Sequence, residues 1–99
     1  MLAKLSAKKQ KLKVNNPSQQ QLSNLLEHYQ NGRFSEAEKL ATSISQEFPK
    51  HQFAWKVLGA IFGQTGRKIE AARASQAAVA LSPQDAEAHS NLGVTLQEL

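Results

Sequence analysis

The strongest constraint in this 99-residue sequence is its internal similarity, because one fixed shift along the chain aligns a series of identical residues. The pairs aligned by a first shift are Gln30 with Gln64, Gly32 with Gly66, Arg33 with Arg67, Glu36 with Glu70, Ala37 with Ala71 and Pro49 with Pro83. A second, equal shift aligns Ala54 with Ala88, Leu58 with Leu92 and Gly59 with Gly93. A constant period of about 34 residues is typical of stacked supersecondary units. We therefore expect two full units, 18–51 and 52–85, and the first helix of a third, 86–99.

The spacing of apolar and small residues within a unit indicates two antiparallel α-helices. Positions i, i+3, i+4 and i+7 form one face of a helix. In the middle unit these positions hold Trp55, Leu58, Gly59 and Phe62 in the first half, and Ala71, Ala74, Ser75 and Ala78 in the second. Large side chains facing small ones allow two helix axes to come close. We expect the closest approach at Gly59 and Ala71, and Trp55 as the largest buried side chain.

Turn and cap residues divide the chain into five predicted helices without strands. The expected helices are about 17–30, one capped by Ser35 and closed by Pro49, about 52–64, about 68–81, and 86–98 with Ala88, Leu92 and Leu96 facing inward. The expected caps are Asn16 with Pro17 at the first helical position and Gln19 as partner, Ser35 with Glu38, and Asp85. The fold class expected is all-α.

The middle unit resembles the tetratricopeptide repeat family. The residues that match the family pattern, in order, are Trp55, Leu58-Gly59, Phe62, Gly66, Ala71, Ser75, Ala78 and Pro83. The first unit matches in its second half, through Gly32, Phe34, Ala37, Ala41, Ile44 and Pro49, and the third through Leu92, Gly93 and Leu96. This resemblance implies a right-handed α–α superhelix of helical hairpins over residues 17–99. Through Tyr-Gln-Asn-Gly-Arg-Phe at 29–34 and Phe-Ala-Trp-Lys-Val-Leu-Gly at 53–59, the chain also resembles the N-terminal repeats of bacterial proteins that continue into glycosyltransferase, sulfotransferase or methyltransferase domains.

The resemblance implies a non-catalytic scaffold whose first helices line a concave groove that binds a peptide or helix of a partner protein. The groove positions given by the repeat phase are Leu22, Ser23, Leu26, Gln30, Phe53, Lys56, Val57, Ala60, Gln64, Ser90, Asn91, Val94 and Gln97. An alternative of another class is a substrate-presenting N-terminal arm of a larger enzyme, one that resembles an O-linked N-acetylglucosamine transferase or a sulfotransferase. We expect a monomer or weak self-association.

The net charge of +4 comes entirely from residues 1–16. This predicted flexible tail carries +5 and no acid, from Lys4, Lys8, Lys9, Lys11 and Lys13, so the remainder carries −1. Such a run is typical of a solvated leader, and the alternative is an adaptor for nucleic acid or an anionic surface. Because the tail has no aromatic residue for stacking on bases, we do not expect nucleic acid as the partner.

The residue types present argue against catalysis in this segment. The absence of cysteine removes disulfides, thiolate metal sites and cysteine nucleophiles, and fits a cytoplasmic location. His28, His51 and His89 do not pair at metal-ligand spacing, so we expect no metal, no cofactor and no catalytic residue. No apolar run reaches the roughly 20 residues of a membrane span. The last predicted helix is half of a hairpin, which indicates a fragment of a longer array or, alternatively, a capping helix.

Overall fold

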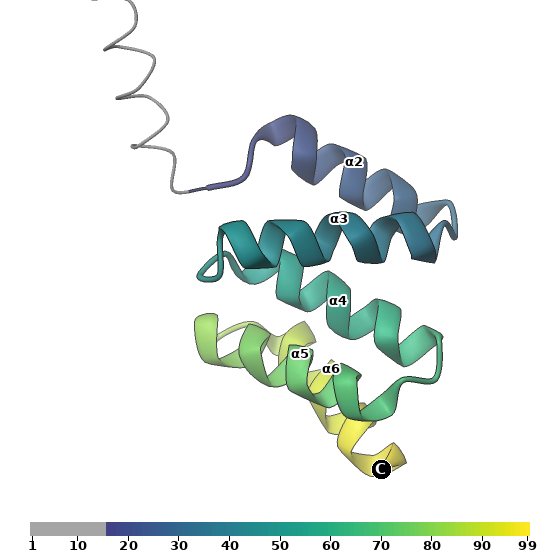
Figure 1. The fold of residues 1–99 in the computed structure, drawn as a ribbon. Helices are drawn as coiled ribbons and strands as arrows, with labels where there is room; N and C mark the ends of the chain where they lie inside the picture. Colours follow the sequence, from purple (N-terminus) through teal and green to yellow (C-terminus); the bar gives the residue numbers. More distant parts are fainter. Residues whose placement is uncertain (1–15) are drawn as a thin grey trace, which may run out of the picture.

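A computed structural model describes residues 16–99, and these fold as a stack of five helices (Figure 1). The helices are α2 (Gln19–Gln30), α3 (Phe34–Glu47), α4 (Gln52–Gln64), α5 (Lys68–Leu81) and α6 (Ala86–Glu98). Each packs on its neighbours in sequence, α4 also contacts α6, and no strand occurs within 16–99. The fold is therefore an all-α helical repeat. The basic tail predicted for residues 1–16 lies, except for Asn16, outside the described residues.

None of the described helices is long and apolar enough to cross a membrane.

The turn within each unit repeats in detail one period later. Gly32 and Gly66 have φ of 73° and 79°, a left-handed conformation that glycine adopts without Cβ strain. The next amide donates back to the preceding helix in both units, from Arg33 to the His28 carbonyl at 2.9 Å and from Arg67 to the Phe62 carbonyl at 2.8 Å. The sequence period is therefore also a period of backbone geometry.

The turn between units repeats as well, although its side chains differ. The indole Nε1 of Trp55 donates to the Pro49 carbonyl at 2.9 Å. His89 stands one period after Trp55, and its Nε2 lies 2.6 Å from the Pro83 carbonyl. A ring nitrogen thus ties the first helix of a unit to the preceding proline in both places.

The predicted start of the first helix was wrong by two residues. Helix α2 begins at Gln19, and its N-cap is Ser18 instead of Asn16. The Ser18 hydroxyl accepts from the Gln21 amide at 3.0 Å, and the Gln21 carboxamide accepts from the Ser18 amide at 2.8 Å. This reciprocal pair satisfies two amide groups, as a capping box requires. Pro17 consequently lies before the helix, where it is buried.

The predicted Ser35 cap was also wrong. Helix α3 begins at Phe34 with Arg33 as N-cap, and no side chain caps it. The left-handed Gly32 fixes where the chain can re-enter a helix, so Ser35 is already within the first turn. Glu38, predicted as the capping partner, instead faces the next unit, where its Oε1 lies 2.7 Å from Arg67 Nη1. The other three starts agree with prediction, and Asp85 caps α6 by accepting from the Ala88 amide at 3.1 Å.

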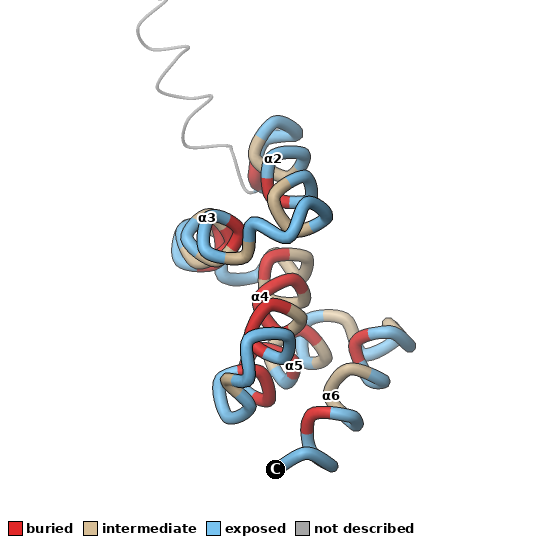
Figure 2. Tube along the Cα trace, turned by 90° about the vertical axis from the view of Figure 1, so that its right-hand side faces the viewer, coloured by how far each residue is buried: buried red, intermediate tan, exposed pale blue. Residues whose placement is uncertain are grey.

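Helix α4 is the centre of the core (Figure 2). Its buried residues are Ala54, Val57, Leu58, Gly59, Ile61 and Phe62. A Cβ at Gly59 would lie 2.6 Å from Ser75 Oγ and 3.7 Å from the Ala71 carbonyl, so α4 and α5 approach closely there. The prediction that Trp55 is the largest buried side chain was wrong, because Trp55 is only partly buried and its indole reaches the Pro49 carbonyl in the turn. The largest fully buried side chains are Leu25, Ile44 and Ile61.

The prediction that three side chains of the last helix face inward was partly wrong. Ala88 is buried, Leu92 is intermediate, and Leu96 is 49% exposed. Leu96 corresponds to Phe62, which is enclosed because α5 and Arg67 cover it. No described helix follows α6 to cover Leu96 in the same way.

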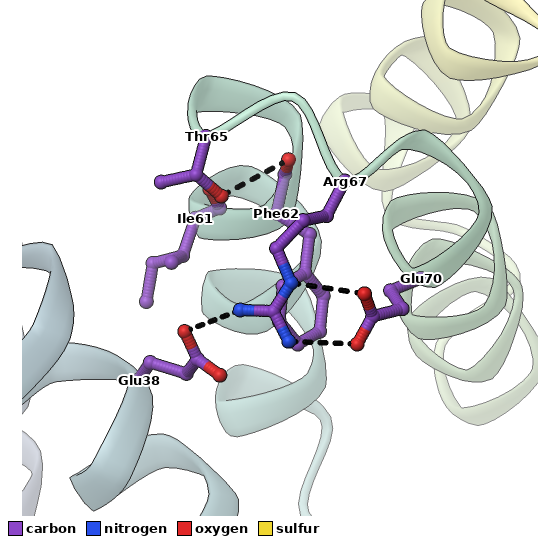
Figure 3. A network of polar contacts seen from close by, with 6 residues as sticks. All are labelled: Glu38, Ile61, Phe62, Thr65, Arg67 and Glu70. Carbon is purple, nitrogen blue, oxygen red and sulfur yellow. Dashed lines mark hydrogen bonds and ion pairs between the residues drawn. The ribbon is translucent and has the colours of Figure 1, made fainter.

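Arg67 joins three helices at the turn between α4 and α5 (Figure 3). Its guanidinium lies 2.7 Å from Glu38 of α3 and donates two hydrogen bonds to Glu70 of α5, at 2.9 and 2.7 Å. It also lies over the Phe62 ring of α4, with Cζ 4.5 Å from the centroid. These contacts raise the pKa of Arg67, chiefly through Glu70 and then Glu38, and Arg67 in turn lowers the pKa of Glu70.

Candidate binding trough

A continuous hollow runs over one face of the stack along α2, α4 and α6. Three adjoining depressions form it: the central one of about 330 Å³ shares Leu26 and Phe53 with one neighbour and Tyr29, Ala60 and Asn91 with the other. We call it the trough. Its lining is Gln19, Leu22, Ser23, Leu26, Tyr29, Phe53, Lys56, Val57, Gly59, Ala60, Gly63, Gln64, Glu87, Asn91, Val94, Thr95 and Glu98.

The alternation of helices explains why the trough has this lining. Each unit places its first helix on one side of the stack and its second on the other, and Figure 2 shows α2 and α6 opposite α3. One repeat period spans two helices, so residues that are one period apart lie at equivalent positions of successive trough helices. One such row is Gln19, Phe53 and Glu87, and another is Leu26, Ala60 and Val94. A partner crossing the units would meet these rows in sequence.

The floor of the trough offers apolar surface that the fold itself does not cover. Leu26 and Val94 remain 41% and 54% exposed, whereas Val57 between them is 7% exposed. Phe53 is partly buried against the core. Burying such side chains contributes roughly 25 cal/mol per Å² of apolar surface. The trough can therefore bind apolar side chains of a ligand.

Polar groups stand along the same surface. Gln64 Nε2 donates to the Tyr29 hydroxyl at 3.4 Å, which links α4 to α2 across the trough. Asn91 is intermediate in exposure and lines the central depression. A side-chain amide at this position can both donate to and accept from a peptide backbone.

Lys56 is the cation of the trough, and two carboxylates hold it. Its Nζ lies 3.0 Å from Asp85 Oδ2 and also contacts Glu87. Gln52 Nε2 donates to the same Asp85 oxygen at 2.9 Å. The hydrogen bond with Glu87, followed by that with Asp85, raises the pKa of Lys56. Asp85, held first by Lys56 and then by the Ala88 amide, has its pKa lowered to about 2.

This network performs two tasks with one carboxylate. One oxygen of Asp85 caps α6, and the other accepts from Gln52 and Lys56 of α4. Helix α6 is thereby fixed at its first turn against α4. The unit before it has Leu22 in place of Lys56 and His51 in place of Asp85. The network of Asp85 with Gln52 and Lys56 therefore has no equivalent in the first half of the trough.

Ten of the thirteen predicted groove residues line the trough. Those outside its lining are Gln30, Ser90 and Gln97, and all three are exposed. Their binding role, like that of the other ten, remains a prediction. The prediction missed Gln19, Tyr29, Glu87 and Glu98 among others. Three of these follow from the repeat phase itself, since Gln19 and Glu87 correspond to Phe53, and Glu98 corresponds to Gln64.

Within residues 16–99 no group of three or more histidine, cysteine, aspartate or glutamate side chains could hold a metal ion. No protein-family model matches the chain, and no curated protein matches it.

Proposed function

We propose that this chain is a tetratricopeptide-repeat module that binds a segment of a partner polypeptide in the trough and performs no chemistry of its own. The observation that carries the proposal is the trough, which crosses three helices and leaves Leu26 and Val94 exposed on its floor. The apolar floor suits the apolar face of a helical peptide, and the amide groups beside it suit an extended peptide, whose backbone needs hydrogen-bond partners.

The test begins with a random peptide library. Peptides are selected on the full 99-residue chain, and their contact surface is mapped by NMR on the ¹⁵N-labelled protein. We expect the selected peptides to shift amide signals of α2, α4 and α6. Signals of α3 and α5 that shift instead, or a failure to enrich any peptide, would contradict the proposal.

Matched variants sharpen the test. Leu26→Ser with Val94→Ser removes exposed apolar surface from the trough, whereas Ile69→Ser with Leu81→Ser removes similar surface elsewhere, from side chains that are 63% and 37% exposed. We expect the trough pair to weaken peptide binding by about ten-fold or more, since hot-spot side chains contribute over about 1 kcal/mol each. The control pair should bind as the wild type does. Equal losses in both pairs would assign the binding elsewhere, and unchanged thermal unfolding shows that both remain folded.

A further inference from the structure

The charges of the trough helices and of the N-terminal segment are opposite. On α2, α4 and α6, Lys56 is the one lysine or arginine, whereas Glu27, Glu87 and Glu98 are acidic. Residues 1–15 carry five lysines and no acid. The outer helices α3 and α5 carry four acidic and three basic residues, so their net charge of −1 is smaller than the −2 that three acidic residues and one lysine give the trough helices.

The single cation of the trough is not available to a ligand. Lys56 already contacts Asp85 and Glu87, so this group of one cation and two carboxylates has a net charge of −1. The Glu87 side chain remains 71% exposed, and Glu98 lies at the far end of the lining. A partner whose charge has the same sign as that of the surface is repelled, and a partner of opposite charge is attracted. An acidic segment is therefore disfavoured here, and a basic one is favoured.

We propose that residues 1–15 of this chain occupy its own trough, a proposal that rests on the proposed function of that surface. The segment offers Leu2, Leu5, Leu12 and Val14 to the apolar floor and lysines to Glu87 and Glu98. The partner chemistry of the trough is accordingly a lysine-rich segment with spaced aliphatic side chains. An outside ligand of this kind competes with the N-terminal segment.

The geometry permits this occupancy. The segment joins the structure at Asn16, and Gln19, three residues later, already lines the near end of the trough. Fifteen extended residues reach at most about 50 Å. That length is comparable with the longest extent of the structure, 57 Å, so the segment can pass α2 and α4 and reach α6. A tethered segment meets its site at an effective concentration on the order of millimolar, which favours even a weak contact.

A nitroxide label locates the segment directly. The chain has no cysteine, so Ser6→Cys gives a single attachment point on the full-length protein. We expect amides of α4 and α6 along the trough, such as Val57, Asn91 and Val94, to lose most of their NMR intensity. Amides of the outer helices, such as Ala72, should keep theirs. Uniform broadening, or none, would overturn the proposal.

Charge variants of the labelled protein supply the control. Replacing Lys8, Lys11 and Lys13 with Gln should restore the trough signals, whereas replacing the exposed outer cations Lys39, Lys50 and Arg73 with Gln should not. The broadening should also weaken at about 1 M salt, where the Debye length falls to about 3 Å. Restoration by both triple variants would overturn the assignment to the segment. A mixture of labelled ¹⁴N protein and unlabelled ¹⁵N protein that shows the same broadening would assign the occupant to a second copy and overturn the intramolecular proposal.

The two proposals can fail separately. If selected peptides shift trough amides but the label leaves them unaffected, the trough is a binding site and the N-terminal segment is not its occupant. If the label acts on the trough but no peptide enriches on either the wild type or the lysine variant, the segment docks there and the general binding function fails. If both hold, the lysine variant should bind trough peptides more tightly, by about ten-fold for a segment that occupies its site about 90% of the time.

Discussion

Gly59 is the residue at which the central hairpin is most tightly packed. A Cβ there would come within 2.6 Å of Ser75 Oγ, a distance that real contacts do not tolerate. Gly93, its counterpart one unit later, has nothing within 4 Å of the same imaginary atom. The two glycines share a repeat position but not an environment, because α5 covers the first and no described helix covers the second.

This difference predicts opposite effects of the same substitution. Gly59→Ala should destabilise the fold relative to Gly93→Ala by about 1 to 3 kcal/mol, the usual cost of overpacking. Gly93→Ala should itself stabilise by about 0.5 to 1 kcal/mol through helix propensity. Chemical denaturation measures both. In a Ser75→Ala background the difference should shrink, since the clashing hydroxyl is gone, and an unchanged difference would place the conflict in the backbone.

Asp85 makes stability depend on acid. Its pKa falls from the ordinary 3.8 to about 2 in the folded state, because Lys56, the Ala88 amide and Gln52 all favour the carboxylate. The unfolded chain therefore takes up the proton first. The resulting stabilisation is complete above about pH 4 and is lost as the pH falls through about 2.

We expect Asp85→Asn to have a lower Tm than the wild type at neutral pH and a shallower decline in acid. Asparagine can still cap α6, so the variant isolates the charge from the cap. Thermal unfolding followed by circular dichroism should show the two proteins approaching each other near pH 2. Curves that stay parallel from neutral pH downward would show that the Lys56 contact contributes nothing.

At the scale of elements, Arg67 connects the two full units. It touches α3, α4 and α5 through Glu38, Phe62 and Glu70 (Figure 3). Arg33 occupies the same turn position one unit earlier, yet its Nη2 is 3.8 Å from Glu27 and its Nε donates only to His28 Nδ1, at 3.1 Å. Arg33 and Arg67 share the turn position, but only Arg67 contacts another unit. A comparison of their variants therefore measures the effect of the contacts between units.

Arg67→Gln should lower Tm by about 4 to 8 °C, the usual shift for losing one modest interaction in a domain of this size. Arg33→Gln should lower it much less. Arg67→Lys keeps the charge but loses the paired hydrogen bonds and the planar contact with the ring, so it should fall between. Calorimetry provides the measurement, and equal effects of the two glutamine variants would remove Arg67 as a tie between units.

The helices could be predicted wherever a turn carried its own chemical signal. Gly66, Pro83 and Asp85 set the bounds of α4, α5 and α6 at the residues expected. The start of α2 could not be decided, because Asn16 and Ser18 each have a glutamine three residues later, and only the fold shows which pair forms. The start of α3 could have been found by moving the correct start of α5, Lys68, back by one period to Phe34.

The sequence predicted which residues line the trough but not the contacts that they make with one another. The repeat period alone placed Phe53, Val57 and Asn91 on one surface. It could not show that Lys56 is held by Asp85 and Glu87, since neither carboxylate has a counterpart in the preceding unit. It also could not show the exposure of Leu96, which depends on what packs beyond α6. Contacts between units depend on residues that break the repeat.

Over the whole molecule, burial is concentrated in the middle of the stack. Helix α4 packs between α3 and α5 and also contacts α6, whereas α2 packs mainly on α3. The buried residue of α2 is Leu25, and those of α6 are Ala88 and Thr95. In a linear stack each helix is stabilised chiefly by its neighbours, so the ends can open while the centre remains folded.

Hydrogen exchange should therefore be graded along the chain. Amides of α4 around Leu58 and Ile61 should exchange slowest, and those of α2 and α6 roughly 10 to 100 times faster, a ratio that corresponds to the burial of about one large apolar side chain. NMR-detected exchange on the full chain measures this gradient. A trough ligand that contacts α2, α4 and α6 together would raise the protection of both ends toward that of α4, since opening either end would break the contact. Uniform protection without ligand would show instead that the five helices unfold as one unit and that the stack has no weak ends.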